Sequence, residues 1–177
     1  QIFYIAGSIE LGGNLTGIYP TEEARLFNFR DYITKGSPEK LQNTDNGILL
    51  GSGIAKKMSL DLGDRIQIST ITGAVFPLKI VGIYQSGVAD IDAIHSFVNI
   101  KTIQRILGEA ENYITDINVK LFDIYNALPM AKEIEQQFNL TAIDINTANA
   151  QFDTGTTIRN LITYAVSVTL LIVAGFG

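Results

Sequence analysis

The sequence predicts an α+β protein in which strand-helix-strand units flank a β-rich middle and the C-terminus leads into a membrane helix. Three observations predict this. Residues 46–69, NGILLGSGIAKKMSLDLGDRIQIS, have the pattern strand, glycine turn, short helix, turn, strand. Strands next to amphipathic helices recur toward both ends of the chain. Residues 161–177, LITYAVSVTLLIVAGFG, carry no charged side chain.

Composition limits the class of protein. The 177 residues suffice for one domain or two small ones. The net charge is −5 and the lysines and arginines are scattered singly, so no basic stripe is present to bind nucleic acid. The chain has no cysteine, which excludes disulfides and thiolate metal sites and leaves the compartment open.

The first part of the chain predicts two strands and a helix. Strands are expected at 2–9 and 15–19, joined by a turn at Gly12-Gly13-Asn14. Thr21 is a suitable N-cap for a helix that runs to Lys35, because acidic residues follow it in the first turn. The apolar face of this helix consists of Leu26, Phe29 and Ile33, assisted by Phe27.

A polar connector at 37–45, which contains Pro38, marks a candidate subdomain boundary. In the central unit that follows, Ile48 to Leu50 form a short buried strand and Gly51-Ser52-Gly53 forms a turn. The next helix has one apolar face, and the strand 65–69 is expected to return beside the first. The apolar face consists of Ile54, Ala55, Met58 and Leu60.

Two further strands and a helix are predicted downstream. A turn at 72–74 leads to a strand at 75–84, and a turn at Ser86-Gly87 precedes a strand at 96–100. A helix of about two turns then ends at Gly108. Its apolar face consists of Ile103, Ile106 and Leu107.

The last part of the chain again predicts strand, helix and strand. Residues 114–122 alternate between apolar and polar, Asp123 is the expected N-cap of a helix, and 140–145 form a final strand. The helix carries its apolar residues at helical spacing: Leu128, Ala131, Ile134 and Phe138.

The end of the chain predicts a stalk and a membrane helix. Residues 146–160 are polar and low in charge, and 161–177 are the start of a span of roughly 20 residues. The other interpretation of 161–177 is a buried C-terminal helix or strand. Since the chain opens in an apolar run without an initiator Met, we expect it to belong to a longer protein.

Four runs in series resemble a known family. They are ILLGSGIAKKMSLDLGDRIQI, FPLKIVGIYQSGVADID, FVNIKTIQRILG and INVKLFDIYNALPMAKEI. Over residues 15–138 the chain resembles the extracytoplasmic (periplasmic) domain of MacB/LolC/LolE/FtsX-type ABC transporter permeases. The resemblance implies a discontinuous mixed α/β porter-like subdomain, residues 1–43 and 112–146, with an inserted β-rich subdomain at 44–111. A stalk at 147–160 and a transmembrane helix from 161 to 177 follow.

The resemblance also implies a function. A permease domain of this family is not itself catalytic and transmits ATP-driven movement for export or for lipoprotein or lipid release. An ABC ATPase subunit or domain, a second permease as homodimer or heterodimer partner, and the inner membrane are the implied partners, with this domain in the periplasm. The implied substrate is a lipoprotein, lipid, peptide or drug. One feature departs from the lipoprotein-releasing members: only STITGAV, residues 69–75, stands where they carry an extended hook that recruits a periplasmic carrier.

The residues themselves predict no catalytic, cofactor-binding or metal site. His95 has no neighbouring ligand set, and Ser96 next to it on a strand faces the other way. Gly51-Ser52-Gly53 lacks the rest of a phosphate-binding motif, and a structural turn explains it better. Aspartates occur at expected turns and caps: Asp61, Asp64, Asp90, Asp92 and Asp123.

A rival hypothesis comes from a different class of protein. It is a soluble ligand-binding or enzymatic domain, built on a small barrel around residues 46–69, with the C-terminal apolar segment buried in its own core.

Overall fold

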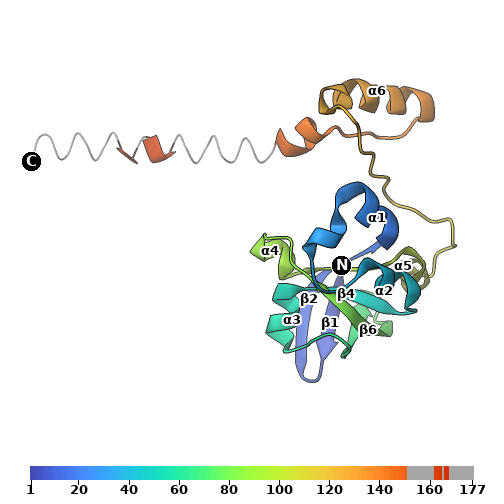
Figure 1. Cartoon of the computed structure of the whole chain (residues 1–177), viewed down its shortest axis with the longest axis vertical. Helices are drawn as coiled ribbons and strands as arrows, with labels where there is room; N and C mark the ends of the chain where they lie inside the picture. The colour runs from blue at the N-terminus through green and yellow to red at the C-terminus, as the bar shows by residue number, and fades with distance from the viewer. Residues whose placement is uncertain (151–161, 165, 168–177) are drawn as a thin grey trace, which may run out of the picture. The chain divides into compact units, whose positions relative to one another are not determined.

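The computed structural model describes residues 1–150, 162–164 and 166–167. The chain divides into two compact units, Gln1–Asn118 and Val119–Gly177 (Figure 1). The first unit holds a seven-stranded sheet, and the described part of the second contains η2 (Ile124–Asn126) and α6 (Ala127–Phe138).

Most strands of this sheet close into a barrel. They are β1 (Ile2–Ala6), β2 (Ile9–Ile18), β4 (Gly47–Gly51), β5 (Arg65–Thr70), β6 (Val75–Tyr84) and β7 (His95–Asn99). The order is β6-β4-β7-β2-β1-β5, and the pairing of β5 with β6 closes the ring. The pairs β2–β7 and β4–β6 are parallel, and the others are antiparallel. The short strand β3 (Ile33–Gly36) extends the sheet from β6 outside the ring.

The first hairpin turns earlier than predicted. β1 and β2 join at Gly7, whose φ is +58°, and Gly12 and Gly13 lie inside β2, so the predicted turn at 12–14 is wrong. Gly13 is needed for another reason. A Cβ on Gly13 would lie 2.3 Å from the carbonyl oxygen of Ile94 and 2.5 Å from Cε2 of Tyr4. The absence of a side chain at Gly13 therefore allows Ile94 and Tyr4 to lie close to the backbone of β2.

The predicted helix 21–35 is divided. It consists of α1 (Pro20–Phe27) and the 3₁₀ helix η1 (Phe29–Tyr32), and β3 follows. The break falls at Asn28, which adopts the left-handed conformation with φ +56° and caps α1. Asparagine tolerates this conformation better than most residues, so the apolar periodicity that continues to Ile33 does not keep the chain helical.

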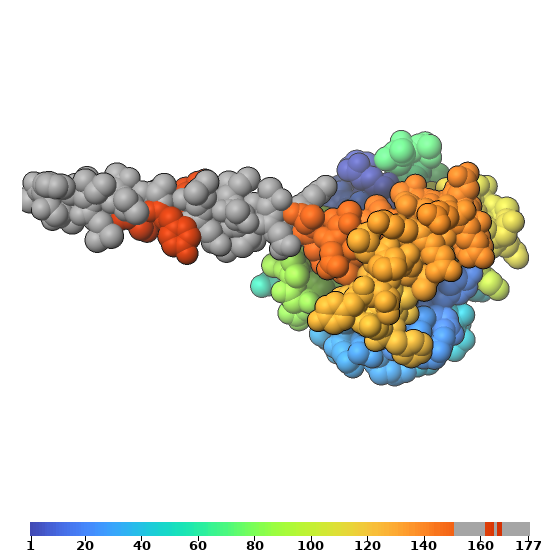
Figure 2. Space-filling view, turned by 90° about the horizontal axis from the view of Figure 1, so that it is seen from above, coloured from blue at the N-terminus to red at the C-terminus, as the bar shows by residue number. Residues whose placement is uncertain are grey.

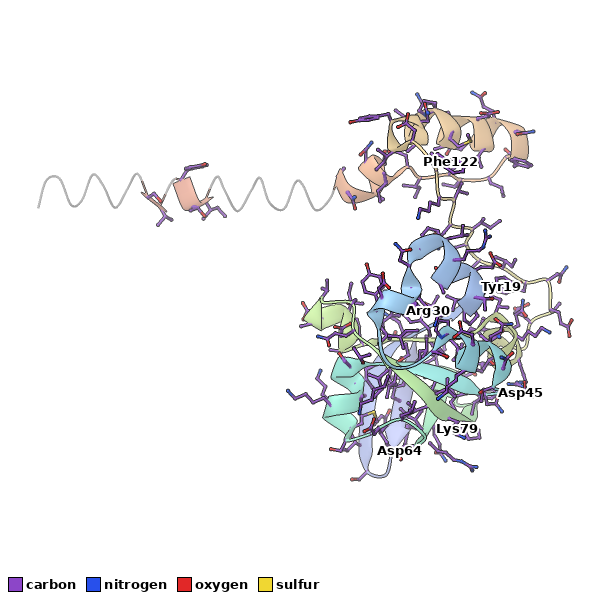
Figure 3. All side chains as sticks on the ribbon, in the orientation of Figure 1. Tyr19, Arg30, Asp45, Asp64, Lys79 and Phe122 are labelled. Atoms are coloured by element: carbon purple, nitrogen blue, oxygen red, sulfur yellow. The ribbon has the colours of Figure 1, made fainter. Side chains whose placement is uncertain are left out.

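The predicted connector 37–45 contains a helix, α2 (Pro38–Asn43). The Ser37 hydroxyl accepts a hydrogen bond from the Lys40 amide at 3.3 Å and caps this helix. Leu41 is completely buried, and an ion pair between Arg30 and Glu39 links η1 to α2. Figure 3 labels Arg30. One buried leucine in a polar stretch thus anchors a helix.

For the central unit, the predicted elements are confirmed and one predicted strand pairing is wrong. β4, α3 (Ser52–Met58) and β5 occur in the predicted order. However, β4 pairs with β6 and β7, and β5 pairs with β1 and β6, so β5 does not return beside β4. The segment downstream agrees with prediction: β6, β7 and α5 (Ile100–Leu107), which ends at Gly108 with φ +72°. A one-turn helix, α4 (Ala89–Asp92), lies between β6 and β7.

Two apolar clusters hold the first unit together. The larger fills the barrel and is built from residues of every strand of the ring, including the completely buried Tyr4, Ile48, Leu50, Ile68, Ile80 and Val98. The smaller lies outside the ring and contains Ile18, Leu41, Leu49 and Val81, with Phe29, Ile33 and Phe97 against it. Helix α2 packs on β4, β6 and β7, α3 on β4 and β6, and α5 on β2 and β7.

The end of the described chain differs from prediction. Residues 114–122 and 140–145 contain no strand, although both were predicted to form one. Asp123 does act as an N-cap, since its side chain accepts a hydrogen bond from the Tyr125 amide at 3.0 Å. The 3₁₀ helix η2 (Ile124–Asn126), α6 (Ala127–Phe138) and a helical stretch at 145–150 follow. Alternation marks two faces of a segment, but a strand also needs an edge to pair with.

The observed units differ from the predicted division of 1–43 with 112–146 against 44–111. Strands β1 and β2 pair with β5 and β7, so residues before 43 and after 44 build one barrel. Figure 2 shows the side chains of α6 in orange. Most of the predicted stalk at 147–160 and of the membrane helix at 161–177 lies outside the described residues. Among those described, no helix combines the length and apolar character that a bilayer crossing requires.

Candidate functional site

At the predicted glycine turn, Gly51-Ser52-Gly53, the backbone lies in close contact with residues 92–95. A Cβ on Gly51 would lie 2.4 Å from the carbonyl oxygen of Asp92 and 2.7 Å from that of His95. A Cβ on Gly53 would lie 2.8 Å from Cα of Ala93. The glycines thus let the start of α3 lie directly against residues 92–95, which supports the structural interpretation of this motif.

Asp92 fixes the loop between β6 and β7. Its side chain is 4% exposed, and Oδ1 accepts hydrogen bonds from the Ser86 amide at 2.7 Å and the Ser86 hydroxyl at 2.8 Å. Burial, together with the charge of Asp92, raises the pKa of Tyr84, whose hydroxyl donates to the carbonyl of His95 at 3.0 Å. The Asp92 carboxylate therefore holds the backbone of the β6–β7 loop at Ser86. From the sequence, Asp92 was predicted only to lie at a turn.

His95 and Ser96 lie on opposite faces of β7. The His95 Nε2 and the Thr16 hydroxyl are 2.8 Å apart, and the imidazole packs edge-on against Phe97 with ring centroids 4.8 Å apart. Burial lowers the pKa of His95. Ser96 is completely buried in the barrel, so the structure does not bring these two residues together as nucleophile and base.

The remaining aspartates named above serve turns and caps. Asp61 forms an ion pair with Lys35 at 2.7 Å, which lowers the pKa of Asp61, and Asp64 accepts a hydrogen bond from the Asp61 amide at 2.8 Å. Asp90 is exposed on α4, and Asp123 caps η2. In the part of the chain that the structure describes, no three acidic or histidine side chains come close enough to hold a metal ion.

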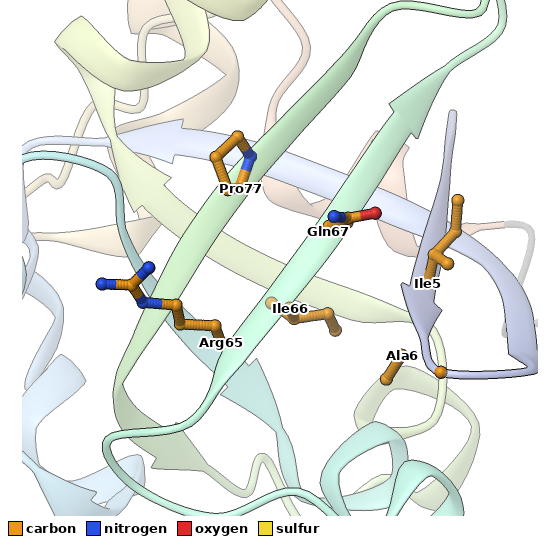
Figure 4. Close-up of a pocket in the computed structure, with 7 residues that line it drawn as sticks. Ile5, Ala6, Arg65, Ile66, Gln67 and Pro77 are labelled. Carbon is orange, nitrogen blue, oxygen red and sulfur yellow. The ribbon is translucent and has the colours of Figure 1, made fainter.

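Hollows occur on the surface of the barrel unit, among them one over the strands and one near the start of α5. The larger, about 450 Å³, is lined by Ile5, Ala6, Gly7, Arg65, Ile66, Gln67 and Pro77 (Figure 4). The smaller, about 140 Å³, is polar and lies near the start of α5. Sequence analysis missed the larger hollow, because its residues come from three strands whose pairing is not encoded locally.

The β5–β6 hairpin is short and regular. The Thr70 amide donates to the carbonyl of Ala74 at 2.9 Å, and the Gly73 amide donates to that of Thr70 at 2.9 Å. Gly73 has φ +85°, and Ile71 at the tip is 77% exposed. Residues 69–75 thus form a tight turn.

Comparison with known proteins gives a family and relatives. Residues 3–137 match the family model of the MacB-like periplasmic core domain. The chain is 28% identical over 131 residues to the lipoprotein-releasing system transmembrane protein LolC of Neisseria meningitidis serogroup B, covering 69% of this chain and 31% of that protein. It is 25% identical over 134 residues to the protein of the same name from Xylella fastidiosa strain Temecula1, covering 71% and 32%.

The chain spans about a third of the length of the curated relatives it matches. The family match includes every strand of the barrel and most of α6. The similarity therefore concerns the barrel unit and the segment that follows it.

Proposed function

Because this chain belongs to the MacB-like periplasmic core domain family, we propose that it is the extracytoplasmic domain of an ABC transporter permease. The single observation that carries this proposal is the family match over residues 3–137, which the similarity to LolC proteins supports. In this role the domain binds no cofactor and catalyses no reaction, and a separate nucleotide-binding subunit or domain hydrolyses ATP.

The proposed role is to pass on movement as a rigid body. A closed barrel has no open edge within the ring, and its interior is filled by tightly packed side chains. Such a body keeps its shape when it is displaced, so a small movement at the membrane becomes a rotation or translation of the whole barrel. We propose that residues 147–160 carry this movement as a stalk and that 161–177 begin the membrane helix.

The proposed partners follow from the family. An ABC ATPase acts from the cytoplasmic side, and a second permease, identical or different, completes the transporter. The membrane is the inner membrane, with the barrel in the periplasm or extracytoplasmic space. The LolC relatives are named as parts of a lipoprotein-releasing system, so release of a lipoprotein or lipid is one proposed activity and export of a peptide or drug is the other.

The β5–β6 hairpin bears on which activity applies. With its tight turn, it does not offer an extended arm to a soluble carrier. We therefore propose a transporter that moves its substrate without docking a periplasmic carrier at this hairpin.

Location can be tested with a single engineered cysteine, because the chain has none. Ile71→Cys places a thiol on the exposed hairpin tip, and Leu50→Cys places one in the completely buried barrel core. In spheroplasts that produce the protein from its full gene, without other cysteines, a membrane-impermeant maleimide should label Ile71→Cys before lysis. Leu50→Cys should stay unlabelled until the protein is denatured. Labelling of Ile71→Cys only after lysis would contradict an extracytoplasmic domain.

The transport role has a separate test. The protein produced from its full gene, purified in detergent, should retain a nucleotide-binding partner and show ATP hydrolysis that vanishes when that partner is removed. Repeated purification without any ATPase, under conditions where the barrel remains folded, would overturn the transporter assignment.

The rival hypothesis of a soluble small-barrel domain is supported by one observation and opposed by another. The barrel exists, but its interior is filled by apolar side chains, which leaves a ligand only the outer surface.

A further inference from the structure

The larger surface hollow lies where the pairing of β1 with β5 ends. Outward residues of β1, β5 and β6 line it together with Ala6 and Ile66, which pack toward the barrel core. Inward side chains of these strands, such as Tyr4, Ile66 and Leu78, fill the barrel, so their neighbours along each strand face outward. The strand register aligns Ile5 with Gln67 and Gln67 with Pro77, which makes one row across the three strands.

This hollow, called the groove below, has an apolar side and a cationic side. Figure 4 shows Gln67 between Ile5 and Ala6 on the β1 side and Pro77 and Arg65 on the β6 side. No carboxylate is among the described residues that line it. A volume of about 450 Å³ falls in the range of small-ligand sites.

The cationic side has two positive charges directly opposite each other. Arg65 on β5 lies directly opposite Lys79 on β6 in the strand register, and both side chains are exposed (Figure 3 labels Lys79). Like charges in directly opposed positions repel each other. In the described part of the chain, neither side chain takes part in any of the three salt bridges.

The nearest carboxylates in sequence and register are those of Asp64, Asp45 and Glu10, and among the described residues none of them forms a salt bridge with Arg65 or Lys79. Asp64 precedes Arg65, and its Oδ2 accepts a hydrogen bond from the Asp61 amide. Glu10 is opposite Ile5 on β2, at the apolar side of the groove. An anion at Arg65 and Lys79 would therefore relieve the repulsion that the protein leaves in place.

We propose that the groove binds an anionic amphiphile, with its phosphate or carboxylate head at Arg65 and Lys79 and its acyl chain across the outward row formed by Pro77, Gln67 and Ile5. Gln67 is two residues from Arg65 on β5 and faces the same side, so its amide can donate a hydrogen bond to the head. This binding goes beyond the membrane role proposed above and does not depend on it, because the purified chain alone would show it.

Calorimetry with the whole 177-residue chain tests the proposal, with dodecyl phosphate below its micelle concentration as the probe. Arg65→Gln and Lys79→Gln should each weaken binding about tenfold, since each removes one charged contact to the head. Lys57→Gln, on α3 and outside the groove, is the matched control and should leave affinity unchanged.

Three further probes separate the possible sources of binding. Octyl phosphate should bind more than about tenfold more weakly than dodecyl phosphate, because four methylene groups are lost. Inorganic phosphate and dodecyl maltoside should each bind far more weakly, since the first lacks the chain and the second lacks the charge. Equal binding of the maltoside, equal binding of inorganic phosphate, or unchanged affinity in both Arg65→Gln and Lys79→Gln would overturn the proposal.

A measurement without ligand guards against misfolded variants. If Arg65 and Lys79 repel each other, Lys79→Gln should unfold at a slightly higher temperature than the parent chain in the absence of probe. With dodecyl phosphate present the parent should gain more thermal stability than the variant. A variant that loses both binding and thermal stability would contradict the proposed repulsion.

Discussion

At the scale of single residues, the polar side chains of the barrel unit hold backbone in place. Asp92 ties two ends of one loop together, and the Tyr4 hydroxyl donates to the carbonyl of Asn14 at 2.8 Å. Burial raises the pKa of Tyr4, so this hydroxyl stays protonated. Buried polar groups that are fully engaged in this way fix a conformation and are costly to remove.

Asp92→Ala should destabilise the barrel unit. The change leaves the Ser86 amide and hydroxyl without their buried acceptor, so we expect the free energy of unfolding to fall by about 1–3 kcal/mol. Urea unfolding followed by circular dichroism measures the loss. Asp90→Ala, two residues away on the exposed side of α4, should change stability by less than about 0.5 kcal/mol. Equal stability of the two variants would contradict the role assigned to Asp92.

His95 should make stability depend on pH. Because burial lowers its pKa below the ordinary 6.5, the unfolded chain binds the proton more readily than the folded one. The histidine contribution is therefore fully present above 6.5 and is lost as pH falls from 6.5 through the folded pKa. His95 is the only histidine, so its imidazole resonance can be followed by NMR and should titrate below 6.5.

His95→Gln provides the control for this titration. Glutamine can keep a hydrogen bond to Thr16 but does not titrate. The decrease in the urea midpoint between about pH 7.5 and about pH 5.5 should be smaller in the variant than in the parent. An equal decrease in both would show that other groups cause it.

At the scale of elements, the β4-α3 junction and the loop before β7 form one interlocked pair. Glycines at 51 and 53 admit residues 92–95 at distances that no side chain would allow. The C-terminus of α3 is closed by Ser59 in the left-handed conformation, φ +54°, whose amide donates to the carbonyls of Ala55 and Lys56. The short helix thus depends on contacts at its start and on its cap more than on its length.

Gly53→Ala tests this interlock. Alanine favours a helix by up to about 1 kcal/mol, but its Cβ would lie 2.8 Å from Cα and 2.9 Å from the amide nitrogen of Ala93. Overpacking against backbone should dominate, so we expect a net loss of about 1–3 kcal/mol in urea unfolding. Gly12→Ala, whose Cβ would have its nearest neighbour at 3.9 Å, should be close to neutral. A stabilised Gly53→Ala would show that the loop moves aside easily.

At the scale of the whole molecule, the described apolar clusters lie entirely in the first unit. Both clusters are built from residues before 118, whereas in the second unit Ala131 is the one apolar residue described as buried. Its large apolar residues, among them Phe122, Tyr125 and Phe138, are exposed. The stability of the described chain therefore resides in the barrel.

A chain of residues 1–118 should fold by itself. We expect cooperative urea unfolding with the same midpoint as the full chain, because residues 111–120 are all exposed. Residues 1–94 lack β7, which lies between β4 and β2, so this shorter chain should not fold. A broad, uncooperative transition for residues 1–118 would show that the second unit stabilises the barrel.

Sequence patterns predicted which segments form strands and helices more reliably than they predicted which strands pair with each other. β4, α3, β6, β7 and α5 were predicted because turn glycines, caps and apolar periodicity are properties of a few consecutive residues. Gly12-Gly13 was misassigned because glycine serves both turns and close approaches, and only the position of Ile94 and Tyr4 distinguishes the two. The groove residues were missed because Arg65 and Lys79 become neighbours only through the pairing of β5 with β6.

By itself, the sequence determined which segments of the barrel unit form most strands and helices, which of their faces are apolar, and the family resemblance. The tertiary structure decided that β1 and β2 belong to the same closed ring as β4, β5, β6 and β7. It also decided that residues 114–122 and 140–145 form no strand. The physical reason is that alternation with period two tells which face of a strand is buried but not which strand lies beside it. That choice depends on hydrogen bonds and packing between segments far apart in the chain.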